Sequence, residues 1–392
     1  MKSDSVTMKP ATEAIHRSYV PPRDVEPLTI PIYETTTYVF DSAQQVRDYN
    51  EGRTDKFLYT RYGNPTVAAV EHKLARLERA ECALVLSSGQ AATASALIAL
   101  LSAGDEVVCS AAIYGGTLHL LNDLFAKVAV TPRFVRLEEL QTPERTLSAK
   151  TKVLWFESPI NPTLRCVDIR SVADACRARG VISILDNTFA SPINQQPLQL
   201  GIDVVMHSAT KYLNGHSDVT AGVLAGPAEI IGRIEKVRRM FGAILDPLPA
   251  YALGRGLKTL AVRVERQNAS ALAVARWLST DSRVQRVYYP GLPDHPDHQI
   301  AARQMRGFGG MICLDVGSYD GAARFFDRLT VIQRAASLGG VESLCSLPIL
   351  TSQWGYSDDE LREAGITPGM ARLSIGLEDA GDLIADLDQA LD

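Results

Sequence analysis

Short strand-like segments alternate with helical stretches through the first half of the chain. The strand-like segments occupy residues 83–86, 104–109, 153–156, 181–185 and 202–206, and small or polar residues follow each of them. Apolar residues at helical spacing precede the first of them, at residues 67–77, and lie between others, at residues 91–101 and 172–178. Short apolar runs bounded by turn residues predict buried strands. Their alternation with helices predicts an α/β fold in which a large domain holds a mostly parallel sheet.

The pattern changes in the second half of the chain. A helical region runs from about residue 230 to 278, with a break at the prolines near 246–249. Strand-like segments then appear at 284–289, 311–316 and 372–375, with helical spacing around 320–329 and 381–391. This mixture predicts a smaller α+β domain at the C-terminus. We therefore divide the chain into an arm at 1–60, a large domain at 61–255 and a C-terminal domain at 256–392.

The first 60 residues contain many prolines and little helical periodicity. Residues 30–40 are nevertheless rich in β-branched and aromatic side chains, which seldom remain fully solvated. The segment is therefore predicted to be an extended arm that lies on another subunit.

Composition excludes several classes of function. The chain has 392 residues, 46% of them hydrophobic, and a net charge of −5, which gives no footprint for nucleic acid. No apolar run approaches the roughly 18 residues that a membrane span needs. Residues 1–10 are polar, so we expect no signal peptide. The six cysteines are scattered, without close pairs of the metal-ligand type, so we expect no metal site and the reduced thiols of a cytoplasmic protein.

The segment at 202–206 stops at a polar cluster of Ser208, Thr210 and Lys211. The C-terminal ends of strands in an open α/β sheet face the ligand crevice, where hydroxyl groups suit an anion. A lysine in a partly dry pocket beside other cations becomes a nucleophile. Hydroxyls for a phosphate beside such an amine suggest a Schiff base with pyridoxal 5′-phosphate (PLP). A solvated surface lysine is the structural alternative.

Two other strand ends carry groups that suit the same ligand. Asp186 follows 181–185, where a buried carboxylate needs a partner; a protonated pyridine nitrogen would serve, and a turn cap is the alternative. Ser88 and Gly89 join the segment 83–86 to a helix. The free N–H groups at that helix start predict an anion site, although a tight turn without a ligand would have the same sequence.

Further polar residues have both a functional and a structural interpretation. Tyr114, followed by two glycines, could lay its ring on a planar cofactor or be an ordinary loop tyrosine. Asn161 is held in a stiff loop between two prolines. Tyr59 and Arg61 would face the same way in an extended strand, or belong to an ordinary surface. Arg372 could bind an α-carboxylate through its guanidinium fork or be solvated.

Together these residues resemble the Cys/Met-metabolism family of PLP-dependent enzymes of fold type I. The resemblance covers nearly the whole chain, from Pro31 to Leu387. The matching motifs occur in order and are Tyr59-x-Arg61, Ser88-Gly89, Tyr114-Gly115, Asp186-Asn187-Thr188, Ser208-Ala209-Thr210-Lys211-Tyr212, Ser337-Leu338-Gly339 and Arg372-Leu373-Ser374.

The resemblance implies a role for each matching residue. Lys211 binds the cofactor, Asp186 pairs with its ring nitrogen, and Tyr114 stacks on the ring and acts as acid or base. The phosphate is held by Gly89, Gln90, Ser208 and Thr210 and, from the neighbouring subunit, by Tyr59 and Arg61. Thr188 lies against the ring, and the amino-acid substrate is oriented by Asn161, Ser337 and Arg372. The family also implies a homotetramer built from two catalytic dimers.

Two apolar positions favour one activity within the family. Members that handle cystathionine resemble one another in a glutamate before the Tyr-x-Arg tyrosine and another before Ser-Leu-Gly. Here these positions hold Leu58 and Ala336, as in methionine γ-lyases. An apolar lining suits a methyl thioether. We therefore expect γ-elimination from methionine to give 2-oxobutanoate, ammonia and methanethiol.

Other positions keep alternatives open. Gly116 and the loop at 214–218 are more similar to cystathionine γ-lyase, and Gln90 replaces a methionine common in the family. The alternatives are cystathionine γ-lyase, cystathionine γ-synthase and homoserine sulfhydrylase. A phosphate-binding protein without chemistry is an alternative from another class. It leaves Lys211 and Asp186 unexplained.

Overall fold

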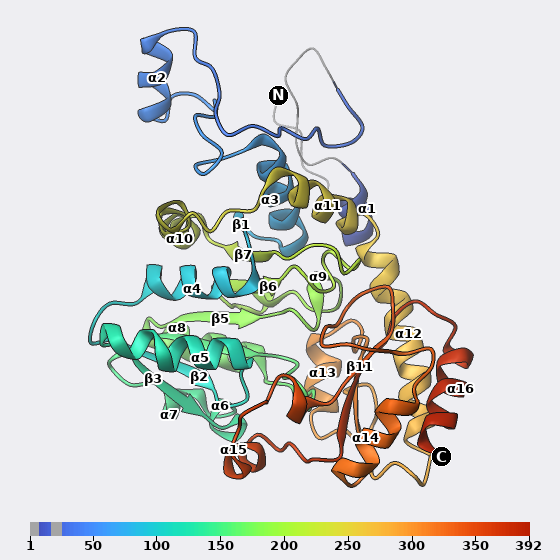
Figure 1. Ribbon diagram of the computed structural model, residues 1–392. Helices are drawn as coiled ribbons and strands as arrows, with labels where there is room; N and C mark the ends of the chain where they lie inside the picture. The colour runs from blue at the N-terminus through green and yellow to red at the C-terminus, as the bar shows by residue number, and fades with distance from the viewer. Residues whose placement is uncertain (1–7, 17–25) are drawn as a thin grey trace.

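The computed structural model describes residues 8–16 and 26–392, which form two sheets with helices packed around them (Figure 1). The larger sheet has seven strands in the order β1-β7-β6-β5-β4-β2-β3. β7 is antiparallel to both of its neighbours, and the remaining pairs are parallel. The strands are β1 Cys82–Leu86, β2 Glu106–Ser110, β3 Thr131–Val135, β4 Thr151–Glu157, β5 Ile182–Asp186, β6 Val204–Ser208 and β7 Gly222–Gly226.

Helices cover both faces of the larger sheet because alternate side chains of each strand point to opposite faces. Leu84 and Leu86 of β1 pack in one core with Leu97 of α4, whereas Val85 packs in another core with Leu74 of α3. The longer helices around this sheet are α3 Pro65–Glu78, α4 Gly89–Leu100, α5 Gly115–Asp123, α8 Ile169–Arg179, α10 Ala228–Phe241 and α11 Pro247–Leu257. The short ones are η1 Phe125–Val128, α6 Leu137–Leu140, α7 Pro143–Thr146, α9 Ser191–Asn194 and η2 Pro197–Leu200.

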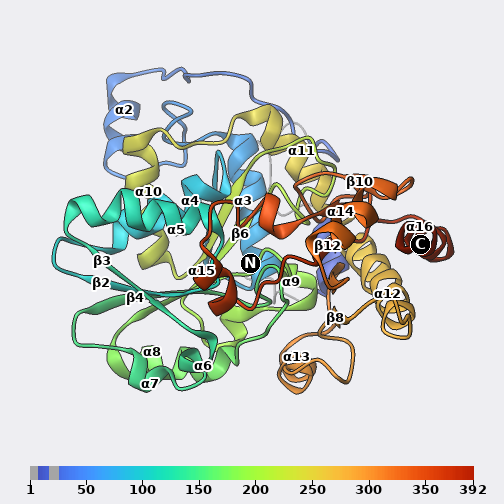
Figure 2. The same ribbon diagram turned by 60° about the horizontal axis from the view of Figure 1, so that its bottom comes forward.

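The second sheet has the order β10-β11-β12-β9-β8 and lies to one side of the larger sheet (Figure 2). Its core joins Leu314 and Leu373 of the sheet to Leu278, Phe325 and Leu387 of the covering helices. The strands are β8 Arg286–Tyr288, β9 Met311–Asp315, β10 Gln333–Arg334, β11 Leu344–Ser346 and β12 Met370–Ser374. The helices are α12 Leu260–Leu278, α13 His298–Gln304, α14 Tyr319–Arg328, η3 Pro348–Leu350, α15 Asp358–Glu363 and α16 Ala380–Leu391.

The architecture confirms the predicted fold class, a mostly parallel sheet followed by a smaller α+β unit. The strand-like segments of the first half all become strands, with ends displaced by up to about two residues. β3 was missed because Pro132 weakens a strand pattern, and β3 is an edge strand, where proline is tolerated. The predicted domain boundaries near residues 60 and 255 stay predictions.

The predicted arm needs two corrections. It contains helices α1 Pro10–Ile15 and α2 Ala43–Asn50, although little helical periodicity was expected there. α2 has no buried residue, and Ser42 caps its start by accepting a hydrogen bond from the backbone N–H of Gln45. Residues 1–7 and 17–25 of the arm lie outside the described residues.

The second correction concerns the geometry at Tyr59 and Arg61. Tyr59 makes a single bridge with Thr37, and the chain then turns, because the N–H of Tyr62 donates to the carbonyl of Tyr59 at 2.8 Å. The expected extended strand through Arg61 is therefore wrong. Within the described ranges, no helix is both long enough and apolar enough to cross a membrane.

Candidate functional site

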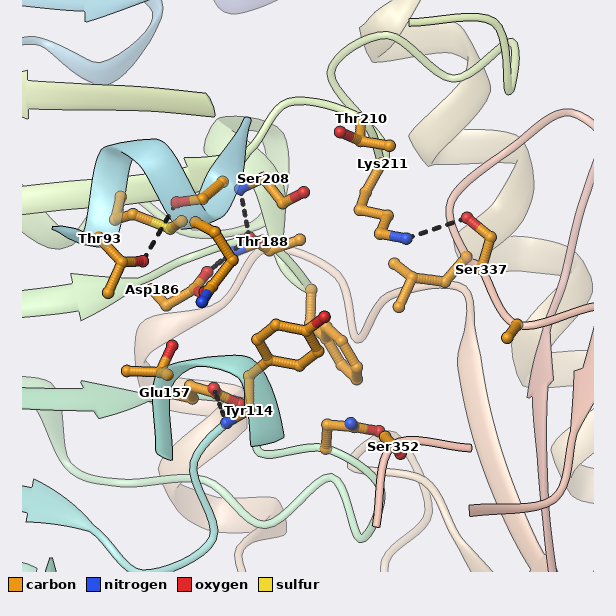
Figure 3. A pocket seen from close by; sticks show the side chains of 18 of the residues that line it. Thr93, Tyr114, Glu157, Asp186, Thr188, Ser208, Thr210, Lys211, Ser337 and Ser352 are labelled. Carbon is orange, nitrogen blue, oxygen red and sulfur yellow. Dashed lines mark hydrogen bonds between the residues drawn. The ribbon is translucent and has the colours of Figure 1, made fainter. Parts of the chain in front are cut away.

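A cavity of about 600 Å³ opens where the C-terminal ends of the larger sheet face the second sheet. Most of the residues predicted for the site line it, although they come from distant parts of the chain. They are Gly89, Gln90, Tyr114, Asn161, Asp186, Thr188, Ser208, Thr210, Lys211, Ala336, Ser337 and Arg372. Figure 3 shows the side chains of several of them converging on the cavity.

Lys211 follows the end of β6 and extends its amine across the cavity. The amine donates a hydrogen bond to the Ser337 hydroxyl, with Nζ and Oγ 3.0 Å apart (Figure 3). Burial and, to a smaller extent, the neighbouring Arg372 guanidinium lower the pKa of Lys211 to about 8. About a tenth of this lysine is therefore a free amine at pH 7, far more than for an ordinary lysine, as a nucleophile or base requires.

Asp186 is held at the end of β5 by its neighbour Thr188. The backbone N–H of Thr188 donates to Asp186 Oδ1 at 3.0 Å, and the Thr188 hydroxyl donates to the same oxygen. The N–H of Ser208 in turn donates to the Thr188 hydroxyl at 2.8 Å. Burial raises the pKa of Asp186. The carboxyl group thus lies on the cavity wall, without a cation bound to it among the described residues.

The start of α4 provides a site for an anion. Ser88 caps this twelve-residue helix, because its hydroxyl accepts a hydrogen bond from the N–H of Ala91 at 3.0 Å. A Cβ at Gly89 would lie 3.1 Å from Cβ and 3.2 Å from Oγ of Ser208, so glycine keeps that hydroxyl close to the helix start. Backbone N–H groups, a helix dipole and hydroxyls together suit a phosphate.

Gln90 and Thr210 line the same cavity, but their polar groups already have protein partners. The Gln90 amide donates to the Gly116 carbonyl at 2.8 Å, and the Thr210 hydroxyl accepts from the N–H of Ala221 at 3.1 Å. These contacts fix where the two side chains lie. The Thr210 hydroxyl also donates to the Ala221 carbonyl at 3.3 Å, so the oxygens of both side chains can only accept further hydrogen bonds.

The second sheet contributes a buried arginine. Arg372 of β12 donates from Nη1 to Asn161 Oδ1 at 2.8 Å and from Nη2 to the Ser337 carbonyl at 3.3 Å. Burial lowers the pKa of Arg372. Among residues 8–16 and 26–392 no carboxylate forms an ion pair with it. Its charge therefore remains available to a substrate carboxylate.

Tyr114 precedes α5 and presents its ring to the cavity with 48% of the residue exposed. Its backbone N–H donates to Glu157 Oε1 at 2.7 Å (Figure 3). The ring is thus accessible to a planar ligand, while the backbone behind it is fixed.

Three residues predicted for the site lie outside the cavity of their own chain. The Leu58 carbonyl accepts from the N–H of Tyr38 at 3.3 Å, and Tyr59 is 41% exposed. Arg61 donates to the Arg239 carbonyl at 2.8 Å and lies 4.6 Å from the ring centroid of Tyr62. Their predicted role from a neighbouring subunit stays a prediction.

Sequence reasoning missed Glu157. It ends β4 as Asp186 ends β5, the two are register partners, and both line the cavity. Burial first, and then Asp186, raise the pKa of Glu157 to about 8. The signal was present, because a carboxylate at the end of a buried strand needs a partner at either position.

Comparisons with known proteins identify the family to which the chain is similar. A family model described as Cys/Met metabolism PLP-dependent enzyme matches residues 11–392. L-methionine gamma-lyase of Fusobacterium nucleatum subsp. nucleatum is 40% identical over 369 residues, which are 93% of this chain and 93% of that protein. Cystathionine gamma-synthase 1, chloroplastic, of Nicotiana tabacum is 39% identical over 394 residues, 100% of this chain and 72% of that protein. The crystal structure of metB from Corynebacterium glutamicum has a TM-score of 0.92 at 36% identity and covers 98% of both chains.

Proposed function

Because the chain belongs to the Cys/Met metabolism family of PLP-dependent enzymes, we propose that it is a carbon–sulfur lyase of the methionine γ-lyase type. Its reaction would convert methionine and water to 2-oxobutanoate, ammonia and methanethiol. The observation that carries this choice is the apolar wall of the cavity at Ala336, beside Leu338 and Leu350.

The residues of the cavity fit PLP. The start of α4 with the Ser208 hydroxyl suits its phosphate, Asp186 suits a protonated ring nitrogen, and Lys211 suits its aldehyde. When bound, PLP supplies an electron sink for the carbon atoms of an amino acid. Tyr114, whose ring faces the cavity, would lie against the planar cofactor.

The chain's own groups can orient and deprotonate the substrate. Arg372 and Asn161, already joined at 2.8 Å, would bind the α-carboxylate. The Lys211 amine, with its pKa near 8, would take the α proton at Nζ, and Ser337 Oγ holds that nitrogen at 3.0 Å. The Tyr114 hydroxyl would donate a proton to the departing sulfur.

The wall at Ala336 discriminates between substrates through one charge. Cystathionine carries a distal ammonium, which would lose a charge-assisted hydrogen bond worth roughly 1.5–3 kcal/mol if no carboxylate faces it. A methyl thioether has no such group and gains about 0.8 kcal/mol for each buried CH₂-sized unit. Methionine should therefore be favoured about tenfold to a hundredfold.

The test compares kcat/KM for methionine, cystathionine, homocysteine and O-acylhomoserines. We expect methionine to exceed cystathionine, and Ala336→Glu to move that ratio about tenfold toward cystathionine because it restores a carboxylate. Ala336→Gln, of similar size but neutral, is the control and should not favour cystathionine. A wild-type preference for cystathionine of tenfold or more would contradict the proposal.

The alternative is an enzyme that acts on cystathionine or on an activated homoserine. Gly116 favours it because this position is more similar to cystathionine γ-lyase; a Cβ there would lie 2.6 Å from Cε1 of the Tyr114 ring and 3.1 Å from the Gln90 amide. A larger residue at this position would therefore displace one of these two side chains. The same substrate panel with added cysteine detects replacement at Cγ instead of elimination.

We also propose a homotetramer in which each site is completed by a neighbour. The support is that Tyr59 and Arg61 lie outside their own cavity, in a segment with exposed apolar residues such as Val39, 88% exposed. Arg61→Ala should weaken cofactor retention. Mixed with Lys211→Ala subunits, it should recover part of the activity, because one site of each hybrid dimer would be intact. No recovery despite verified subunit exchange would place Arg61 in its own subunit's function.

A further inference from the structure

Glu157 is a buried carboxyl group that no step above uses. It is 6% exposed, and among the described residues it forms no ion pair with a lysine, arginine or histidine. An unpaired charge in that position would cost free energy. The carboxyl group is therefore expected either to hold a proton or to have a function that requires the charge. Its surroundings indicate both a proton and a function.

The geometry pairs Glu157 with Asp186. They are the last residues of the adjacent parallel strands β4 and β5, and they are register partners. Registered neighbours on adjacent strands lie about 4.8 Å apart and point to the same face of the sheet. Both side chains accordingly reach the same cavity. Two carboxyl groups this close cannot both be ionised without strong repulsion.

Their hydrogen bonds distinguish the two members of the pair. Asp186 Oδ1 accepts from both the N–H and the hydroxyl of Thr188, and the nearby His207 ring also favours the ionised form of Asp186. Glu157 accepts a backbone hydrogen bond from Tyr114 at 2.7 Å, and the backbone N–H of Asn161 also lies close enough to affect its pKa. A protonated carboxyl group keeps a carbonyl oxygen that can still accept the Tyr114 bond.

We propose that Glu157 is a positioning residue of the cofactor site: its carboxyl group fixes the backbone of Tyr114 and, by holding the proton of the pair, leaves the negative charge on Asp186. Tyr114 carries the ring that faces the cofactor, and Asn161 holds Arg372 at 2.8 Å. The Glu157 side chain thus contacts the residue that carries the stacking ring and lies beside Asp186, which would carry the charge for the ring nitrogen. It also lies near the loop of Asn161, which holds the substrate-binding Arg372. This inference rests on the proposed role of Asp186, and it does not depend on which sulfur amino acid is the substrate.

The test measures the affinity of the full chain for PLP without amino-acid substrate, together with kcat and KM. Glu157→Gln keeps the size, the neutral state and the accepting oxygen, so its dissociation constant for PLP should stay within about threefold of wild type. Glu157→Asp keeps a carboxyl group but withdraws it from Tyr114. Leaving a buried N–H unpaired should weaken PLP binding about tenfold to a hundredfold and lower kcat more than it changes KM.

The relative PLP affinities of Glu157→Gln and Glu157→Asp test the proposal. Weaker PLP binding by Glu157→Gln than by Glu157→Asp would overturn the proposal, because it would show that a negative charge at residue 157 is required. Equal affinities for wild type and both variants would overturn it as well. Unfolding midpoints of the variants separate positioning from a general loss of stability. Asp186→Ala is the control for the premise: if it binds PLP as tightly as wild type, the proposed site assignment fails, independently of Glu157.

Discussion

Two lysines of this chain share a chemical property but differ in their surroundings. Burial lowers the pKa of both Lys211 and Lys73 to about 8, and in each case a nearby cation, Arg372 or Lys258, adds to the effect. Both are therefore amines that deprotonate near neutral pH. A lowered pKa is often taken as a mark of a functional site.

The neighbourhoods of the two amines are different. Lys73 of α3 is 2% exposed and donates to the Ala14 carbonyl of α1 at 2.8 Å, beside an ion pair between Glu13 and Arg76. It ties the arm to the large sheet's helices and has no access to the cavity at the strand ends. Lys211, in contrast, lies in that cavity among groups for an anion, a ring nitrogen and a carboxylate. Access and complementary neighbours, more than the pKa, mark the functional lysine.

The largest expected effect separates the two lysines directly. Lys211→Ala should lower turnover by roughly 10³-fold or more, because it removes the group that we propose both to hold the cofactor and to act as the base. Lys73→Met keeps the apolar stem and should leave turnover per folded molecule within about twofold. Initial rates with saturating PLP, normalised to folded protein, check both. Near-normal turnover of Lys211→Ala, or a comparable loss in Lys73→Met, would remove the distinction.

The cation beside Lys211, Arg372, offers a second test with an effect of intermediate size. Arg372→Ala should raise KM for the amino acid about tenfold to a hundredfold, since a charge-assisted bond to the carboxylate is lost. It should also move the pH midpoint for amine labelling of Lys211 in cofactor-free protein above about 8, because the repelling charge is gone.

Arg372→Lys is the matched control for these two effects. It keeps the charge but not the planar fork, so KM should rise while the labelling midpoint stays near that of wild type. An unchanged KM in Arg372→Ala would show that this arginine does not bind the substrate. Peptide mapping of the labelled lysine reads out the midpoint.

The sequence predicts the part of the site that depends on local patterns better than the part that depends on long-range packing. The cofactor half could be predicted because Lys211, Asp186 and Ser208 stand at the ends of apolar runs, and the carboxyl ends of parallel strands meet at one edge. Five of the seven strands of the larger sheet were predicted for the same reason, and β7 Gly222–Gly226 was not. β3 escaped because Pro132 obscures its pattern.

The rest depends on contacts that no local pattern carries. Arg372 reaches Asn161 across 211 residues of sequence, so their bond follows only from the way the second sheet packs against the first. Lys73 looks like any helical lysine until α1 folds onto it. Glu157 could have been found, because it repeats the strand-end pattern of Asp186.

The smallest expected effect concerns Lys73 alone and shows what a lowered pKa does where it has no catalytic role. Its pKa is about 8 in the folded protein and 10.5 as the ordinary value, so between these pH values the unfolded chain binds more protons than the folded one. The free energy of unfolding therefore gains a contribution that rises with pH, by at most about 1.4 kcal/mol per pH unit. Lys73→Met lacks this contribution.

Urea unfolding of both proteins at pH 7.5, 8.5 and 9.5 measures the difference. Because Lys211 and the other titrating groups are present in both proteins, their contributions cancel in the comparison. The stability of wild type relative to Lys73→Met should thus increase across this range. A difference that stays constant or falls would mean that Lys73 keeps its ordinary pKa when folded. Of the two lysines, only Lys211 would then have a lowered pKa. A lowered pKa would in that case distinguish the lysine of the cavity from Lys73.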